Sequence, residues 1–85
     1  MKAYVVYILR CSDGTLYTGI TNDIAHRLRV HNEGKGAKYT KTRRPVQLIS
    51  FRRVASKSQA LKLEHFVKKQ PASRKIFALY ESIPS

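Results

Sequence analysis

The sequence predicts an α+β fold, a three-stranded and mostly antiparallel sheet flanked by helices in the order β-β-α-β-α-α. Three observations predict it. An apolar, β-branched and aromatic run is followed by turn residues and then by an alternating run. Two later stretches begin at capping residues and carry apolar side chains at helical spacing, and a third strand-like run separates them. With 85 residues we expect one domain spanning positions 1–85.

Residues 4–10 and 15–20 predict a β-hairpin. The first run is almost entirely apolar, which is typical of a central strand covered on both faces. The tripeptide Ser12-Asp13-Gly14 is a turn signal. The second run alternates, so its side chains divide between two faces, with Leu16, Thr18 and Ile20 on one face and Tyr17 and Gly19 on the other.

The length of the hairpin turn decides where the two strand tyrosines lie. With a three-residue turn, Leu9 faces Tyr17 and Tyr7 faces Gly19, so both phenols share one face of the sheet. With a two-residue turn the register shifts by one residue and the phenols separate. The sequence leaves both registers open, and ordinary core tyrosines would show the same spacing.

Helix signals follow the hairpin. Residues 21–23 offer N-cap candidates for a helix that runs to about Glu33, with Ile24 and Leu28 as its inward stripe and Gly34 as its stop. The stretch 34–44 is a basic, glycine-containing loop, with one helical turn expected around 38–41.

The second half of the chain predicts a strand and two helices. Pro45 opens a third strand over residues 46–54. Ser56 and Gln59 have the spacing of a capping box, which predicts a helix through about residue 69. Pro71 suits the first position of a last helix over residues 72–82.

Positive charge dominates the composition. Seventeen Lys and Arg residues against five Asp and Glu residues give a formal net charge of +12. Such self-repulsion favours a polyanionic partner, so we expect nucleic acid rather than a membrane. The alternative is a merely solvated surface. No acidic residue occurs between Gly34 and Leu63, a stretch that holds Lys35, Lys38, Lys41, Arg43, Arg44, Arg52, Arg53, Lys57 and Lys62.

Other features of the composition predict a cytoplasmic protein. Cys11 is the only cysteine, which excludes an internal disulfide and a thiolate zinc cage. The longest apolar run, residues 3–9, is far shorter than the roughly 20 residues that cross a bilayer. The first four residues lead into a strand-like stretch and lack the parts of a signal peptide.

Glu64 has an unusual position for an acid. On a helical wheel it falls within the apolar arc of Ala60, Leu61, Leu63 and Val67. A carboxylate there must be paired, hydrogen-bonded or bound to a metal, because an unpaired buried charge is very costly. A structural ion pair with one of the many basic residues is the alternative to a functional role.

Arg27 and His31 share one stripe of the first predicted helix, four residues apart. An arginine can hold a phosphate with two hydrogen bonds, and a histidine can donate to a phosphate or relay a proton. Each residue taken alone is more often a solvated helix position.

These residues together resemble the GIY-YIG nuclease superfamily. Val5-Val6-Tyr7 is followed ten residues later by Tyr17-Thr18-Gly19, which is similar to the paired signature of that superfamily. The positions that match its catalytic arginine, its His-or-Tyr position and its metal-binding glutamate are Arg27, His31 and Glu64. The runs 4–21 and 31–40 look like the small stand-alone bacterial branch of YhbQ-like proteins, and the resemblance covers about residues 4–70.

The resemblance implies a metal-dependent endonuclease that hydrolyses phosphodiester bonds in DNA, directed by structure or damage rather than by sequence, as in DNA repair. Glu64 would hold one divalent metal ion, Mg²⁺ or Mn²⁺. Arg27 would clamp the scissile phosphate, and Tyr17 would position or deprotonate the attacking water. Tyr7 and His31 would support it, and Gly19 would leave space above the sheet. The flanking backbone would be held by Lys35, Lys38, Lys41, Arg43 and Arg44.

Two departures from the superfamily pattern predict weak or partner-dependent activity. Several relatives carry a lysine directly after the second signature, where this chain has Ile20. Many also carry an asparagine on the helix after the metal-binding one, and the corresponding stretch here, residues 70–74, contains no asparagine. We expect no counterpart of the accessory domain that selects targets in many relatives, so a protein partner would supply specificity. The alternative function is a nucleic-acid-binding module with the nuclease fold but little or no activity. A structural RNA-associated protein, a third hypothesis, would leave Glu64 unexplained. We expect DNA rather than RNA, and the sequence leaves the oligomeric state open.

Overall fold

The computed structural model describes residues 3–81. Its elements confirm the predicted order, and they include the one-turn helix that was expected around residues 38–41. In chain order they are β1 (Tyr4–Arg10), β2 (Leu16–Thr21), α1 (Ile24–Asn32), α2 (Lys38–Lys41), β3 (Gln47–Val54), α3 (Lys57–Lys68), a 3-10 turn (Ala72–Arg74) and α4 (Lys75–Leu79).

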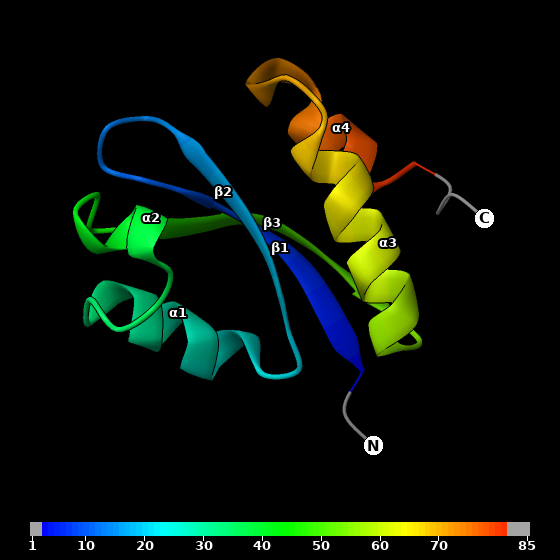
Figure 1. Cartoon of the computed structure of the whole chain (residues 1–85), viewed down its shortest axis with the longest axis horizontal. Helices are drawn as coiled ribbons and strands as arrows, with labels where there is room; N and C mark the ends of the chain where they lie inside the picture. Colours follow the sequence, from blue (N-terminus) through cyan, green and yellow to red (C-terminus); the bar gives the residue numbers. More distant parts are fainter. Residues whose placement is uncertain (1–2, 82–85) are drawn as a thin grey trace.

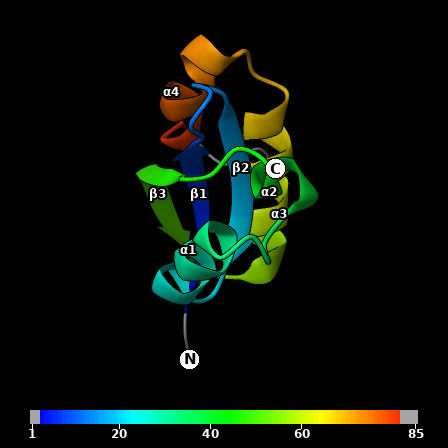
Figure 2. The ribbon, with the colours of Figure 1, turned by 90° about the vertical axis from the view of Figure 1, so that its left-hand side faces the viewer.

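The three strands form one sheet in the order β2-β1-β3, and both strand pairs are antiparallel. Helices α1 and α2 lie on one side of the sheet, and α3 and α4 lie on the other (Figure 1). Figure 2 shows the strands side by side behind α1, with β1 in the middle. Both faces of the sheet are therefore covered by helices, and β2 is an edge strand.

The hairpin adopts the register of the three-residue turn. Leu9 pairs with Tyr17 and Tyr7 pairs with Gly19, so the two phenols share the face that α1 covers. The Cys11 amide donates to the Thr15 carbonyl at 2.8 Å and closes the turn. Gly14 has a φ of +86°, a conformation that only glycine adopts at little cost.

Local capping sets the ends of α1. Asp23 is the N-cap, and its side chain accepts a hydrogen bond from the His26 amide at 3.2 Å. At the other end Gly34 has a φ of +80°, and its amide donates to the His31 carbonyl at 3.1 Å. Both signals were visible in the sequence.

Each face of the sheet has its own buried cluster. The cluster beneath α3 and α4 consists of aliphatic residues, and the cluster on the α1 side includes an aromatic phenol and a thiol. The first comprises Val6, Ile8, Val54, Ala60, Leu63, Val67, Ala78 and Leu79, and the second comprises Val5, Tyr7, Leu9, Cys11 and Val46.

Three expectations for the second half need correction. β3 begins at Gln47 rather than at residue 46, because the Asn32 side chain bonds both the amide and the carbonyl of Val46. Leu61 is 47% exposed, since only the arc of Ala60, Leu63 and Val67 faces the sheet. The expected last helix is divided into the 3-10 turn and α4, and its predicted end at residue 82 lies outside the described residues.

The remaining signals for α3 are confirmed. The Ser56 hydroxyl accepts from the Gln59 amide at 3.2 Å, and the Gln59 side chain accepts in turn from the Ala55 amide at 3.1 Å. No helix within residues 3–81 combines the length and the apolar character needed to cross a membrane.

Candidate active site

Tyr7 lies at the centre of the candidate site. It sits on the middle strand and is only 1% exposed. Its ring extends over Gly19 of β2, where an added Cβ atom would lie 2.5 Å from the phenolic oxygen. Gly19 therefore provides the space that the phenol occupies, as the sequence indicated.

The guanidinium of Arg27, on α1, interacts with the Tyr7 hydroxyl. Burial raises the pKa of Tyr7 above its ordinary value, and the charges of Tyr17 and Glu64 act in the same direction. The hydrogen bond and the positive charge of Arg27 oppose these effects. Tyr7 is therefore a neutral phenol near pH 7 that interacts with a guanidinium.

His31, one helical turn after Arg27, is fully buried. Its Nε2 atom lies 3.0 Å from the Tyr7 hydroxyl, and its Nδ1 atom lies 2.8 Å from the Thr40 hydroxyl on α2. Burial lowers the pKa of His31, and the charge of Arg27 lowers it further. The imidazole is therefore neutral at pH 7 and bonded at both nitrogens.

Tyr17 packs in an aromatic cluster with these groups. Its ring centroid lies 6.5 Å from that of Tyr7, 5.3 Å from that of His31 and 6.1 Å from that of Tyr39, on which it stacks. Unlike Tyr7 it is only half-buried, and it lines a surface pocket of about 250 Å³. Tyr17 is thus the phenol of the pair that water and a substrate can approach.

Glu64 lies on α3, which covers the face of the sheet opposite α1 (Figure 1). Its side chain is 18% exposed and forms an ion pair of 3.3 Å with Lys68, whose side chain is 52% exposed. Its charge raises the pKa of Tyr7. The structure thus contains the ion pair that the sequence offered as an alternative, and the partner is an exposed lysine.

A metal at this site would have one protein ligand. Residues 3–81 contain no group of three or more His, Cys, Asp and Glu side chains able to enclose a metal ion. A single partly exposed carboxylate suits Mg²⁺, which keeps several waters and binds through one or two carboxylates together with substrate phosphates. The donor set therefore fits the expected ion.

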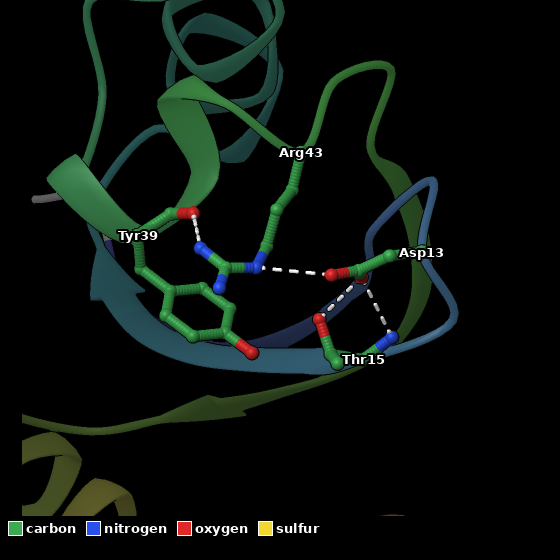
Figure 3. A network of polar contacts seen from close by, with 4 residues as sticks. All are labelled: Asp13, Thr15, Tyr39 and Arg43. Atoms are coloured by element: carbon green, nitrogen blue, oxygen red, sulfur yellow. Dashed lines mark hydrogen bonds and ion pairs between the residues drawn. The ribbon is translucent and has the colours of Figure 1, made fainter.

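The predicted nucleic-acid-binding residues fall into two groups. Lys35, Lys38 and Lys41 are exposed around α2. The guanidinium of Arg43, in contrast, donates to Asp13 at 3.0 Å and to the Tyr39 carbonyl at 2.8 Å, and it covers the Tyr39 ring at 4.0 Å (Figure 3). Arg43 thus fastens α2 to the hairpin turn.

Arg44 also makes contacts within the protein. It donates to the Lys41 carbonyl at 2.9 Å and to the Asn32 carbonyl at 3.4 Å. It remains exposed, however, and lines with Lys41 a broad groove of about 790 Å³ that contains none of the predicted catalytic residues. The basic groove and the phenol cluster are therefore separate features of the surface.

Sequence reasoning missed four residues that complete the site. Thr40 bonds His31, and Tyr39 stacks on Tyr17. Lys68 pairs with Glu64, and Lys75, which lines the Tyr17 pocket with Lys68, donates to the carbonyls of the last turn of α3. Only the spacing of Glu64 and Lys68 on one helix could have revealed any of these contacts.

Comparison with known proteins identifies the family. The model of the GIY-YIG catalytic domain matches residues 3–76. A UPF0213 protein of Staphylococcus aureus (strain N315) is 46% identical over 81 residues, which is 95% of this chain and 99% of the relative.

Two solution NMR structures agree with the fold. A protein from E. faecalis is 36% identical, with a TM-score of 0.63 over 100% of this chain and 96% of its own. A UPF0213 protein from Bacillus halodurans is 43% identical, with a TM-score of 0.54 over 85% of this chain and 77% of its own. The chain belongs to the GIY-YIG nuclease superfamily, in its small stand-alone branch.

Proposed function

We propose that this protein is a metal-dependent endonuclease that hydrolyses phosphodiester bonds in DNA and acts in the cytoplasm on structured or damaged sites. One observation carries the proposal: the buried Tyr7 hydroxyl is hydrogen-bonded to His31 at 3.0 Å and interacts with the charges of both Arg27 and Glu64. An arginine, two phenols, a neutral imidazole and a carboxylate can supply the charge stabilisation and proton transfer of phosphodiester hydrolysis.

Glu64 would hold the metal, and a bound Mg²⁺ would supply charge stabilisation for the phosphate and the leaving oxygen. Lys68 would have to release the carboxylate, which its long and exposed side chain permits. Arg27 would clamp a non-bridging phosphate oxygen with the N–H groups that Tyr7 leaves unused. Tyr7 would hold the guanidinium in that orientation.

Tyr17 would contact the attacking water. It is the half-buried phenol and faces the pocket, whereas Tyr7 is enclosed. A neutral phenol is a poor base, so the main contribution of Tyr17 is to orient the water. Proton removal would need the positive charges of Arg27 and the metal.

The exposed lysines would bind the substrate backbone. Lys35, Lys38 and Lys41 carry charge without a set of base-reading side chains, which favours affinity over sequence selection. A protein partner would then supply specificity. The alternative, a binding module without useful turnover, would use the same basic surface but would not depend on Glu64.

Cleavage of end-labelled single-stranded, duplex and branched DNA tests the proposal. The assay compares the protein with Glu64→Gln and with Glu33→Gln, an exposed acid on the α1 side that loses the same charge. We expect Mg²⁺- or Mn²⁺-dependent products with at least one substrate, a loss of roughly 100-fold or more in Glu64→Gln, and no loss in Glu33→Gln. Binding without cleavage by all three proteins would overturn the nuclease and leave the binding module.

A further inference from the structure

The hydrogen bonds around His31 favour one assignment of protons. The Thr40 hydroxyl lies 2.9 Å from the Ala37 carbonyl, which can only accept, so the single hydroxyl proton of Thr40 is donated there. Toward His31 Nδ1, at 2.8 Å, the Thr40 oxygen must therefore accept. It follows that Nδ1 carries the imidazole proton.

The same assignment fixes the proton of Tyr7. Because burial keeps His31 neutral, a proton on Nδ1 leaves Nε2 with a lone pair. The Tyr7 hydroxyl, 3.0 Å away, must then donate to Nε2, and its oxygen is left to accept from Arg27. All donors point the same way along the chain of Arg27, Tyr7, His31, Thr40 and the Ala37 carbonyl.

We propose that Thr40 is a positioning residue that selects the Nδ1–H tautomer of His31 and thereby holds Arg27 in place for the phosphate. The role in cleavage rests on the function proposed above. With the opposite tautomer, Nε2–H would donate to the Tyr7 oxygen and turn the phenolic proton toward the guanidinium of Arg27. Two donors would then oppose each other, and the contact that orients Arg27 would be lost.

The chain segment around Thr40 is built to hold this arrangement. Thr40 is fully buried, as is His31. Gly36 lies against the imidazole so closely that an added Cβ atom would be 2.4 Å from Nδ1. Next to Thr40, Tyr39 stacks on Tyr17 and is covered by Arg43, which is tied to Asp13 (Figure 3). The α2 segment thus positions both phenols of the site.

The test measures the tautomer directly, by long-range ¹H–¹⁵N NMR of the His31 ring at pH 7.5. The variants are Thr40→Val, which keeps the shape and removes the hydroxyl, Thr40→Ser, which restores it, and Thr42→Val, the same change at an exposed position two residues away. We expect Nδ1–H in the parent, in Thr40→Ser and in Thr42→Val, and Nε2–H or a mixture in Thr40→Val.

Cleavage by the same proteins gives the functional readout. Thr40→Val should lose about tenfold in kcat/KM, the equivalent of one hydrogen bond, and Thr40→Ser should recover most of it. An Nε2–H signal in the parent would overturn the proposal, as would an unchanged tautomer in Thr40→Val. If Thr40→Val does not fold, the parent and Thr40→Ser still decide the tautomer. Absence of cleavage in every protein would refute the nuclease function but not the tautomer assignment.

Discussion

The two faces of the sheet differ in what fills them. Beneath α3 and α4 the buried side chains are aliphatic except for Thr18, with Ile8, Leu63 and Leu79 fully enclosed. Beneath α1 and α2 the enclosed groups include the polar chain of Tyr7, His31 and Thr40. One face therefore gains from apolar burial, while the other must satisfy every polar atom that it encloses.

This difference separates stability from chemistry. Replacing a buried hydrogen-bonded network by apolar side chains is often neutral or stabilising, so stability alone does not account for it. The network interacts with Arg27, and the charge of Glu64 acts on its phenol. We infer that the aliphatic face maintains the fold and that the polar face arranges Arg27, Tyr7 and His31, while α3 adds the carboxylate of Glu64 from the other side.

The largest effect on stability is expected on the aliphatic face. Leu63→Ala removes a fully buried side chain from beneath α3 and should lower the free energy of unfolding by roughly 2–5 kcal/mol. Urea denaturation followed by circular dichroism measures it. Leu61→Ala is the control, because Leu61 is 47% exposed on the same helix and should change stability far less. Equal losses in the two variants would contradict the assignment of the core arc.

A smaller effect, dependent on pH, is expected on the polar face. Because the folded-state pKa of His31 is lowered, the unfolded chain binds a proton first as the pH falls below about 6.5. The buried, neutral His31 therefore contributes to stability above that pH. This contribution is lost progressively as the pH falls through the folded-state pKa of His31.

Urea midpoints between pH 5 and pH 8 measure this dependence. His31→Gln should flatten it, while His26→Gln, an exposed histidine on the same helix, should leave it unchanged. A parent protein whose stability does not fall over this range would contradict a neutral, buried His31.

The smallest effect on stability is expected at the ion pair on α3. Lys68→Met removes the exposed partner of Glu64 and should change the free energy of unfolding by less than about 1 kcal/mol. It should also tighten Mn²⁺ binding several-fold, since the ammonium no longer competes for the carboxylate. Isothermal titration calorimetry measures the affinity, with the exposed Lys69→Met as a control of equal charge. Unchanged affinity in Lys68→Met would place the metal elsewhere.

Sequence reasoning succeeded where the signals are local. The strands, the cap at Asp23, the stop at Gly34 and the capping box at Ser56 are set by neighbouring residues, and each was predictable. The register of the hairpin was not, because two turn lengths suit the same residues.

The contacts that complete the site depend on packing between distant segments. Thr40 meets His31 only because the loop after α1 folds back over the imidazole. The hydrogen bond from Arg43 to Asp13, thirty residues away, also depends on the folded chain and has no local signal. A basic residue in a loop looks the same in the sequence whether it faces solvent or fastens two loops together.

Two neighbouring residues on α3 test the separation of stability from chemistry most directly. Single-turnover cleavage of labelled DNA in Mg²⁺ and urea unfolding would be measured on Leu63→Ala and Glu64→Gln together. We predict that Leu63→Ala loses stability but cleaves at the parent rate under conditions where it is folded, and that Glu64→Gln keeps its stability and loses cleavage. Parent-like cleavage by Glu64→Gln would contradict the account.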